Sequence, residues 1–341
     1  MIMSSQVELD KLIDASRIEQ LRLKGALVLD VDDTLLARQR TNGAGQETFD
    51  ESAAAALLPE FLRRGFNLCL ITGHGWRQLE SRLVAPIVES LRESGDEALI
   101  GRLCVYANRG ATRIAWDGAH YSVDEGYGER YQLRDVDVAA LRGLLESLGA
   151  ELEADFKERG EWYRQAFPRF DFGALPAQVA AREGAVLVLR PIPAQIHAAD
   201  GQPDADSRAQ LYERGLELLH RTDFGDDYEL ARSGRSSIEI TRRSVSKEAA
   251  MRHLIAGLSA LSGESPDSVE ESLVYVGDEF LTGGNDFVIP LLFPRALCLS
   301  VTGEHLGGGT PAGVVQLTRA TGLQGTAAAE ALLRHLLNLS A

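Results

Sequence analysis

Three carboxylates follow a short apolar run near the start of the chain. Residues 26–29 read as a buried strand, and Asp30, Asp32 and Asp33 come directly after it. Asp30 and Asp32 are two positions apart, so in an extended chain their side chains lie on the same side. Two carboxylates held together resist joint ionisation unless a cation lies between them, and Mg²⁺ prefers oxygen ligands. The spacing predicts a magnesium site, although Asp is also common at helix N-caps and turns.

A hydroxyl and two glycines follow a second apolar run. Residues 68–71 read as a strand, and Thr72, Gly73, His74 and Gly75 come next. Thr72 would offer its hydroxyl and its backbone N–H to an anion, and Gly73 would let the backbone come close. The same pattern is also an ordinary helix start, so both interpretations stay open.

A lysine opens the helix expected at residues 246–258. A basic residue there runs against the preference of helix N-termini for acids. The presence of Lys247 at this position is explained if its side chain reaches an anion; otherwise it is a solvated surface lysine.

Two more acids come with the strand expected at residues 273–276. Asp278 follows that strand directly, and a glycine-rich loop delivers Asp286 eight positions later. Ligands bind at the carboxyl ends of parallel strands. We therefore expect Asp278 to complete a magnesium site with Asp30, and Asp286 to orient Lys247 or to hold metal-bound water.

Short apolar runs alternate with helical patterns at both ends of the chain, which predicts an α/β, Rossmann-like core with a parallel sheet. The patterns in the middle are shorter and more mixed, which predicts an inserted α+β domain. We expect the core at residues 1–109 and 237–341 and the insertion at 110–236. Further expected strands are 103–106, 296–300, 162–166, 185–189 and 237–240, with a hairpin from 112–116 toward Tyr121, and expected helices are 51–64, 76–91, 136–148, 176–182, 207–219, 312–320 and 326–339.

The composition fits a globular protein, with 45% apolar and 25% charged residues. Lys plus Arg is 35 and Asp plus Glu is 50, so the net charge is 35 − 50 = −15. A chain this acidic has no overall attraction for nucleic acid or anionic membranes. If the chain binds phosphates, we therefore expect a local site with a metal cation to do so. We expect no membrane helix, and a cytoplasmic location, because the three cysteines are far apart and no signal peptide is visible.

Together the four motifs resemble those of the haloacid dehalogenase superfamily of phosphotransferases, in the order Asp-x-Asp-x-Thr, Thr, Lys and Gly-Asp with a downstream Asp. The resemblance implies a magnesium-dependent phosphatase whose partner is a small phosphorylated molecule. It implies that Asp30 is the nucleophile, which forms an aspartyl-phosphate, and that Asp32 is the general acid and base. The implied Mg²⁺ ligands are Asp30, the backbone carbonyl of Asp32, and Asp278. Thr72, Gly73 and Lys247 would bind phosphate, and Asn285 and Asp286 would support the site.

The insertion resembles the α/β cap of the sugar-phosphate phosphatase branch, and the loop 277–286 is similar to that of phosphomannomutases. In this cap we expect Arg164 or Arg190 to contact the substrate. Two positions depart from the pattern: Asp33 stands where many members have Gly, and His74 where Arg is frequent.

Three alternatives remain. The 277–286 loop allows a sugar phosphomutase, which would need a bisphosphate activator. A dehalogenase is disfavoured, because that chemistry has no acid at the position of Asp32. A non-catalytic binding protein on the same fold is possible, but every reactive residue type is present.

Overall fold

The computed structural model describes residues 8–37, 47–158, 178–182, 184–190, 205–233, 237–281, 284–302 and 311–340. Contacts divide the chain into two compact units. Unit 1 comprises Met1–Asp124 and Ser246–Ala341, and unit 2 comprises Glu125–Val245. Among the described residues, no helix combines the length and the apolar character that crossing a membrane requires.

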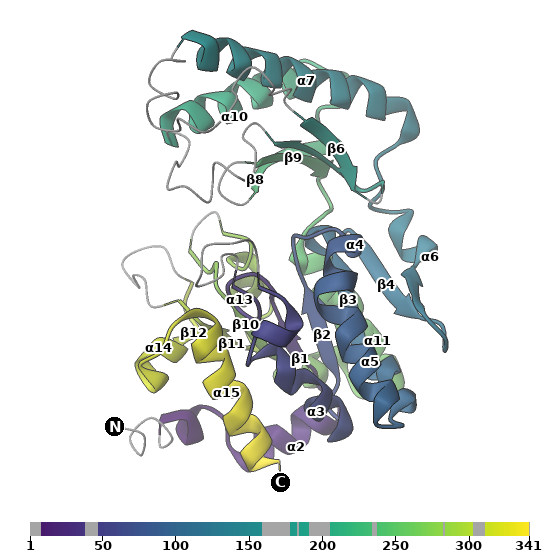
Figure 1. Ribbon diagram of the computed structural model, residues 1–341, viewed down its shortest axis with the longest axis vertical. Coiled ribbons are helices and arrows are strands. Elements are labelled where there is room, and N and C mark those ends of the chain that lie inside the picture. The colour runs from purple at the N-terminus through teal and green to yellow at the C-terminus, as the bar shows by residue number, and fades with distance from the viewer. Residues whose placement is uncertain are drawn as a thin grey trace. The chain divides into compact units, whose positions relative to one another are not determined.

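Unit 1 is built on an eight-stranded sheet with the order β12-β11-β10-β1-β2-β3-β4-β5 (Figure 1). The first six strands in this order are parallel, and the β4–β5 hairpin adds two antiparallel strands at one edge. The strands are β1 (Leu27–Leu29), β2 (Leu68–Ile71), β3 (Leu103–Ala107), β4 (Thr112–Trp116), β5 (Tyr121–Val123), β10 (Val274–Gly277), β11 (Leu297–Ser300) and β12 (Val314–Gln316).

Helices cover both faces of this sheet, which is why its central strands are continuous apolar runs. Leu27 and Leu29 of β1 face one large core cluster, and Val28 between them is equally buried. The cluster packs against α2 (Ala15–Leu23), α3 (Leu58–Arg63), α5 (Ala85–Glu93) and α15 (Gly325–Leu339). The other face receives α11 (Lys247–Ser262), whose His253 contacts Tyr106 of β3, with α12 (Pro266–Glu271) and α13 (Val288–Leu292) beside α11.

Three shorter helical segments complete unit 1. They are α4 (Trp76–Leu79), the π-helical turn Glu80–Val84 that joins it to α5, and α14 (Leu317–Thr321). The helix expected at residues 312–320 is partly wrong. Val314 and Val315 extend the sheet by pairing with β11, and the helix begins only at Leu317.

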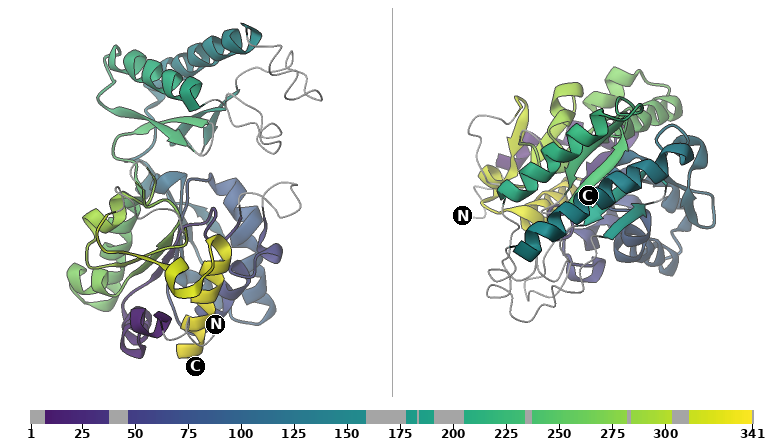
Figure 2. Two further views of the ribbon diagram at one scale, coloured as in Figure 1. Left: turned by 90° about the vertical axis from the view of Figure 1, so that its left-hand side faces the viewer. Right: turned by 90° about the horizontal axis from the view of Figure 1, so that it is seen from above.

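Unit 2 is a four-stranded antiparallel sheet with the order β6-β7-β9-β8 and two long helices on one face (Figure 2). The strands are β6 (Gln178–Arg182), β7 (Val186–Arg190), β8 (Tyr228–Ser233) and β9 (Ser237–Arg242), and the helices are α7 (Asp135–Glu158), α10 (Ala205–His220) and the short α6 (Glu125–Gly128). A separate apolar core joins α7 and α10 to the sheet.

The structure confirms the predicted fold class, a Rossmann-like parallel core with an inserted α+β unit. The helix expected at 176–182 is wrong, because pairing with β7 makes this segment the strand β6. The strand expected at 162–166 lies outside the described residues. The two units also divide differently from the expected boundaries: the hairpin Thr112–Val123 pairs with β3 in unit 1, and β9 pairs with β7 and β8 in unit 2.

Candidate active site

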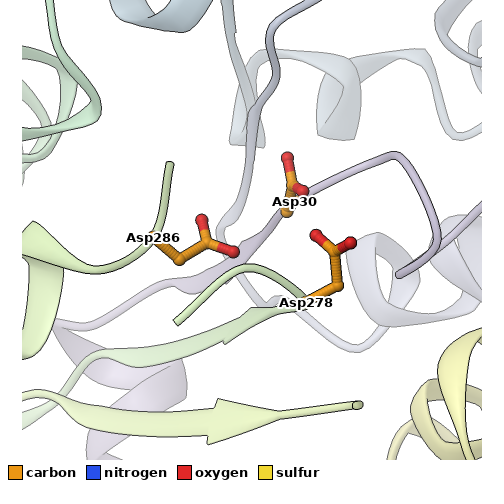
Figure 3. A group of neighbouring side chains, drawn as sticks. All are labelled: Asp30, Asp278 and Asp286. Atoms are coloured by element: carbon orange, nitrogen blue, oxygen red, sulfur yellow. The ribbon is translucent and has the colours of Figure 1, made fainter. Parts of the chain in front are cut away.

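Three aspartates meet at the carboxyl ends of two neighbouring parallel strands of unit 1, β1 and β10. Asp30 follows β1, Asp278 follows β10, and Asp286 comes from the loop after Asp278, with the three carboxylates turned toward one another (Figure 3). One oxygen from each lies within 4.8 Å of the others, so these three side chains are close enough to hold a metal ion together. The Asp30 N–H donates to the carbonyl of Val276 at 2.9 Å, which fixes the end of β1 against β10.

Lys247 supplies positive charge to this aspartate cluster. Its Nζ lies 2.9 Å from Asp30 Oδ1 and 2.6 Å from Asp286 Oδ1. The lysine side chain is 2% exposed, and those of Asp30 and Asp286 are 8% and 0% exposed. Lys247 is the first residue of α11, so the helix start aims it at carboxylates rather than at solvent. This accounts for a basic residue where helices usually place acids.

The two carboxyls that share Lys247 differ in pKa. Burial raises the pKa of Asp30 to about 6, with help from the charges of Asp286 and Asp32, although Lys247 acts in the opposite direction. Burial alone would also raise the pKa of Asp286, but Lys247 and three hydrogen bonds outweigh it and hold that pKa below its usual value. Burial would lower the pKa of Lys247, yet the two aspartates raise it, so the ammonium stays charged.

Asp286 is held by donors on both of its oxygens. Lys247 Nζ and the Tyr275 hydroxyl donate to Oδ1, and the Glu279 N–H donates to Oδ2 at 2.9 Å. Burial raises the pKa of Tyr275, as do the nearby carboxylates, so its hydroxyl keeps the proton that it donates. A Cβ on Gly277 would lie 2.3 Å from Asp286 Oδ2, so only glycine lets this carboxylate approach the end of β10.

The donor set fits a hard divalent cation. Three carboxylates and one ammonium leave a net charge of −3 + 1 = −2 in a buried cluster. Buried charges of one sign need a counter-ion, and carboxylate oxygens suit magnesium and calcium. Because Asp286 already accepts three hydrogen bonds, Asp30 and Asp278 are the better ligands.

The loop after β2 places Thr72 at the same edge of the sheet. Its Oγ1 accepts from the His74 N–H at 3.1 Å, and a hydroxyl that accepts can also donate its own proton. The expectation that the Thr72 N–H serves an anion is wrong, because this N–H donates to the Tyr106 carbonyl of β3 at 3.0 Å.

A left-handed turn after β3 supports this loop. Asn108, Arg109 and Gly110 have φ values of 53°, 59° and 93° in succession. The Arg109 N–H donates to the Thr72 carbonyl and the Asn108 N–H to the His74 carbonyl, each at 2.8 Å. Non-glycine residues in this conformation store strain, and such residues concentrate at functional sites.

No family model matches the sequence, and no curated protein does. Solved structures do resemble it. IMP-nucleotidase from Plasmodium falciparum has a TM-score of 0.54 in its IMP-bound, N-terminally truncated form, at 15% identity over 95% of this chain and 71% of that chain. Its ATP-bound structure has a TM-score of 0.56 at 14% identity, over 99% and 70%. Trehalose-6-phosphate phosphatase from Aspergillus fumigatus has a TM-score of 0.49 at 14% identity, over 96% and 98%.

The chain has the haloacid dehalogenase fold. Asp33, one of the two departures from the haloacid dehalogenase motifs, has a structural explanation. Its φ is 54°, within a tight turn in which its N–H donates to the Leu36 carbonyl at 2.8 Å. Glycine adopts this conformation without strain, and Asp tolerates it better than most other residues do. The position therefore requires a left-handed backbone, which either residue provides.

The structure does not bring all of the predicted site residues together. The aspartate cluster and Thr72 lie where strands of the core end, and Lys247 reaches the cluster from the start of α11. The Asp32 carboxylate lies against His74 instead, so Asp32 remains a predicted metal ligand only through its backbone carbonyl. Asn285 is in the loop before Asp286, and its N–H donates to Glu279 Oε2 at 3.3 Å. Arg164 lies outside the described residues, and of Arg190 only the main chain, at the end of β7, is described.

Sequence reasoning missed two contributors to the site. The first is Tyr275, a polar side chain inside the apolar run 273–276, which was a signal that could have been used. The second is the turn at Asn108–Gly110, where an Asn followed closely by Gly after a strand marks a left-handed backbone.

Proposed function

We propose that this protein is a magnesium-dependent phosphatase that hydrolyses a small phosphorylated metabolite through an aspartyl-phosphate. The observation that carries the proposal is the buried Asp30–Lys247–Asp286 arrangement beside Asp278 at the carboxyl ends of β1 and β10. It combines a carboxylate nucleophile, a fixed cation for phosphate oxygens and a second acid for a metal. The haloacid dehalogenase fold supports this assignment.

In this mechanism Asp30 attacks phosphorus, and the bond to the leaving oxygen breaks. Asp32 donates a proton to that oxygen, and later accepts a proton from the water that hydrolyses the aspartyl-phosphate. The Lys247 ammonium and the Thr72 hydroxyl donate hydrogen bonds to the phosphoryl oxygens, where negative charge must be stabilised. Asp286 keeps Lys247 charged and directed toward Asp30.

Mg²⁺ would be held by Asp30, Asp278 and the backbone carbonyl of Asp32, and would supply Lewis-acid stabilisation of phosphate charge. It would also favour the ionised form of Asp30, whose pKa of about 6 otherwise leaves a fraction of the nucleophile protonated near neutral pH.

For the substrate we propose a sugar phosphate, selected by unit 2 acting as a cap. In β9, Ile238 and Ile240 belong to the core with α7 and α10, so Glu239 and Thr241 lie on the opposite face of the sheet. Thr241 is paired in register with Glu229 of β8, which adds a second carboxylate to that face. This face of the sheet is polar but buried, with Glu239 and Thr241 1% and 0% exposed. The support for a sugar phosphate is therefore the resemblance of the insertion to the cap of the sugar-phosphate phosphatase branch.

The first test is hydrolysis of p-nitrophenyl phosphate by the purified protein with and without Mg²⁺. We expect turnover that requires the metal and is lost in excess chelator and in Asp30→Asn. A panel of hexose phosphates, trehalose 6-phosphate, glycerate phosphates and IMP then assigns the substrate class by kcat/KM. Metal-independent turnover, or no turnover of any panel member, would contradict the proposal, and isomerisation without phosphate release would indicate a mutase.

A further inference from the structure

His74 and Asp32 form a close pair at the edge of the candidate site. His74 Nε2 lies 2.7 Å from Asp32 Oδ1 and 2.6 Å from Oδ2, so the imidazole meets both carboxylate oxygens. Each side chain is 15% exposed, so the pair is largely but not fully shielded from water. An exposed ion pair contributes little, whereas a partly buried contact with such short distances fixes the orientation of both groups.

His74 is itself held from three directions. Its Nδ1 lies 2.9 Å from Gln78 Oε1, one turn along at the end of α4. Its N–H donates to Thr72 Oγ1 at 3.1 Å, and its carbonyl accepts from the Asn108 N–H at 2.8 Å. The main chain and the ring of His74 are therefore both fixed, and one of the contacts that fix them comes from the strained turn Asn108–Gly110. Such support is what a side chain needs if it is to orient another group reproducibly.

We propose that His74 is the positioning residue for the general acid and base Asp32, an inference that rests on the phosphatase function proposed above. In the first half-reaction Asp32 gives its proton to the leaving oxygen as the P–O bond breaks, and becomes a carboxylate. The Nε2 side of His74 then faces that carboxylate and holds it in place. In the second half-reaction Asp32 takes a proton from the attacking water, so no proton is gained or lost over the cycle.

This role makes a specific kinetic prediction. Departure of an alkoxide requires protonation, whereas p-nitrophenolate is a stable anion and leaves with little help. A residue that orients the acid should therefore matter for alkyl phosphates and hardly for p-nitrophenyl phosphate. The informative quantity is kcat/KM, because it covers the steps up to release of the alcohol and is unaffected by later hydrolysis of the aspartyl-phosphate.

The experiment compares His74→Leu and His74→Gln with the wild type on glycerol 3-phosphate, or on the best alkyl phosphate from the panel, and on p-nitrophenyl phosphate. The two replacements are similar in size, but only Gln retains an N–H donor that can reach Asp32. In His74→Leu we expect kcat/KM for the alkyl phosphate to fall by about 10- to 100-fold, part of the 10²–10⁴ typical of general acid catalysis. For p-nitrophenyl phosphate we expect less than about a threefold change, and in His74→Gln a partial rescue.

Asp32→Asn and the double variant with His74→Leu complete the test. If His74 acts through Asp32, the second substitution adds no further loss once Asp32 is gone. Equal losses on both substrates, or a full additional loss in the double variant, would overturn the inference and assign His74 to the architecture of the loop. An Asp32→Asn variant that keeps wild-type kcat/KM on the alkyl phosphate would instead contradict the proposed function. Should His74→Leu fail to fold, the ratio between substrates in His74→Gln carries the same comparison.

Discussion

Each unit of the molecule contains a group of hydrogen-bonded acids, and the two groups shift the pKa values of their carboxyls differently. In unit 1, Asp30 and Asp286 share Lys247, yet the pKa of one is raised and that of the other lowered. In unit 2, the Asp137 carboxylate accepts from Arg134 at 2.6 Å and from the Tyr228 hydroxyl at 2.8 Å. Burial alone would raise the pKa of Asp137, but these two donors lower it.

The difference separates a site arranged for reaction from one arranged for structure. The unit 2 group is closer to charge balance, because Arg134 contacts both Asp137 and Asp227 at 2.6 Å, for a net charge of −2 + 1 = −1. It joins the start of α7 to β8 through the hydrogen bond from the Tyr228 hydroxyl to Asp137. The unit 1 group keeps a larger net negative charge and a carboxyl with a perturbed pKa at strand ends. Acids whose pKa values are pushed apart in one site are typical of catalytic pairs. We therefore expect substitutions in unit 1 to affect turnover, and those in the unit 2 group to affect stability.

The largest contrast is expected between Asp30→Asn and Asp137→Asn. The amide introduced by Asp30→Asn cannot attack phosphorus, so turnover of p-nitrophenyl phosphate should fall by more than about a thousandfold while the thermal melting temperature is retained. The Asp137→Asn variant loses charge-assisted hydrogen bonds, which should lower the free energy of unfolding by about 1–3 kcal/mol with turnover within about twofold. Urea unfolding and steady-state rates measure both quantities. Retained turnover in Asp30→Asn would remove the distinction between the two groups.

The next effect concerns the orientation of Lys247. Asp286→Asn removes one of its two anionic partners, and we expect turnover to fall by about a hundredfold or more, with a loss of stability of about 3–5 kcal/mol for breaking a buried pair. Tyr275→Phe is the matched control. It deletes one hydrogen bond to the same Asp286 oxygen and leaves both charges, so its losses should be several-fold smaller. Equal effects of the two variants would show that packing at this position matters more than the Lys247 ion pair.

The sequence predicted the reacting groups better than their surroundings. Asp30, Thr72, Lys247 and Asp278 each stand at the end of an apolar run or at a helix start, so the pattern of elements alone brings them to one edge of the sheet. The partner of Asp32 was not predictable, because His74 is 42 residues away in the chain and meets it only when β1 and β2 pair. Contacts between loops depend on tertiary geometry that no local pattern encodes.

Strand assignments failed where pairing overrides local preference. The Ala-rich segment Gln178–Arg182 favours a helix by composition, but its register with β7 makes it a strand. Val314–Gln316 is similarly a strand because β11 lies beside it. The inserted domain was expected to begin at residue 110, whereas the contacts begin unit 2 at Glu125. The reason is that, by sequence, the hairpin Thr112–Val123 resembles the start of a new domain. Its hydrogen bonds to β3, and the burial of Ile114 and Tyr121 in the core cluster, assign this hairpin to the core.

A smaller effect tests the turn that supports the site. In Gly110→Ala a new Cβ would lie 2.6 Å from the Ser246 carbonyl oxygen, just before Lys247, at a residue with φ 93°. We expect stability to fall by about 2 kcal/mol or more and turnover to fall as the start of α11 shifts. Gly118→Ala is the control, because Gly118 has φ 101° with nothing within 4 Å. It should show the backbone strain alone, about 1–2 kcal/mol, with turnover unchanged. Equal turnover in the two variants would contradict a positioning role for the turn.

The smallest effect is a difference in how the two groups respond to pH in metal-free buffer. The folded pKa of Asp30, about 6, lies above its usual value, so the folded protein binds this proton more tightly than the unfolded chain does. Stability of the wild type relative to Asp30→Asn should therefore rise as the pH falls from about 6 to about 4. The folded pKa of Asp137 lies below its usual value, so its contribution is complete above about pH 4 and is lost only as the pH falls through that lowered pKa. Urea unfolding of the wild type, Asp30→Asn and Asp137→Asn between about pH 4 and about pH 7.5 should give a sloping difference for the first variant and a constant one for the second. Parallel curves for both variants would mean that the neighbours of Asp30 stabilise its ionised carboxylate as well as those of Asp137 do. The two units would then differ in their effect on turnover and not in the pKa of their carboxyls.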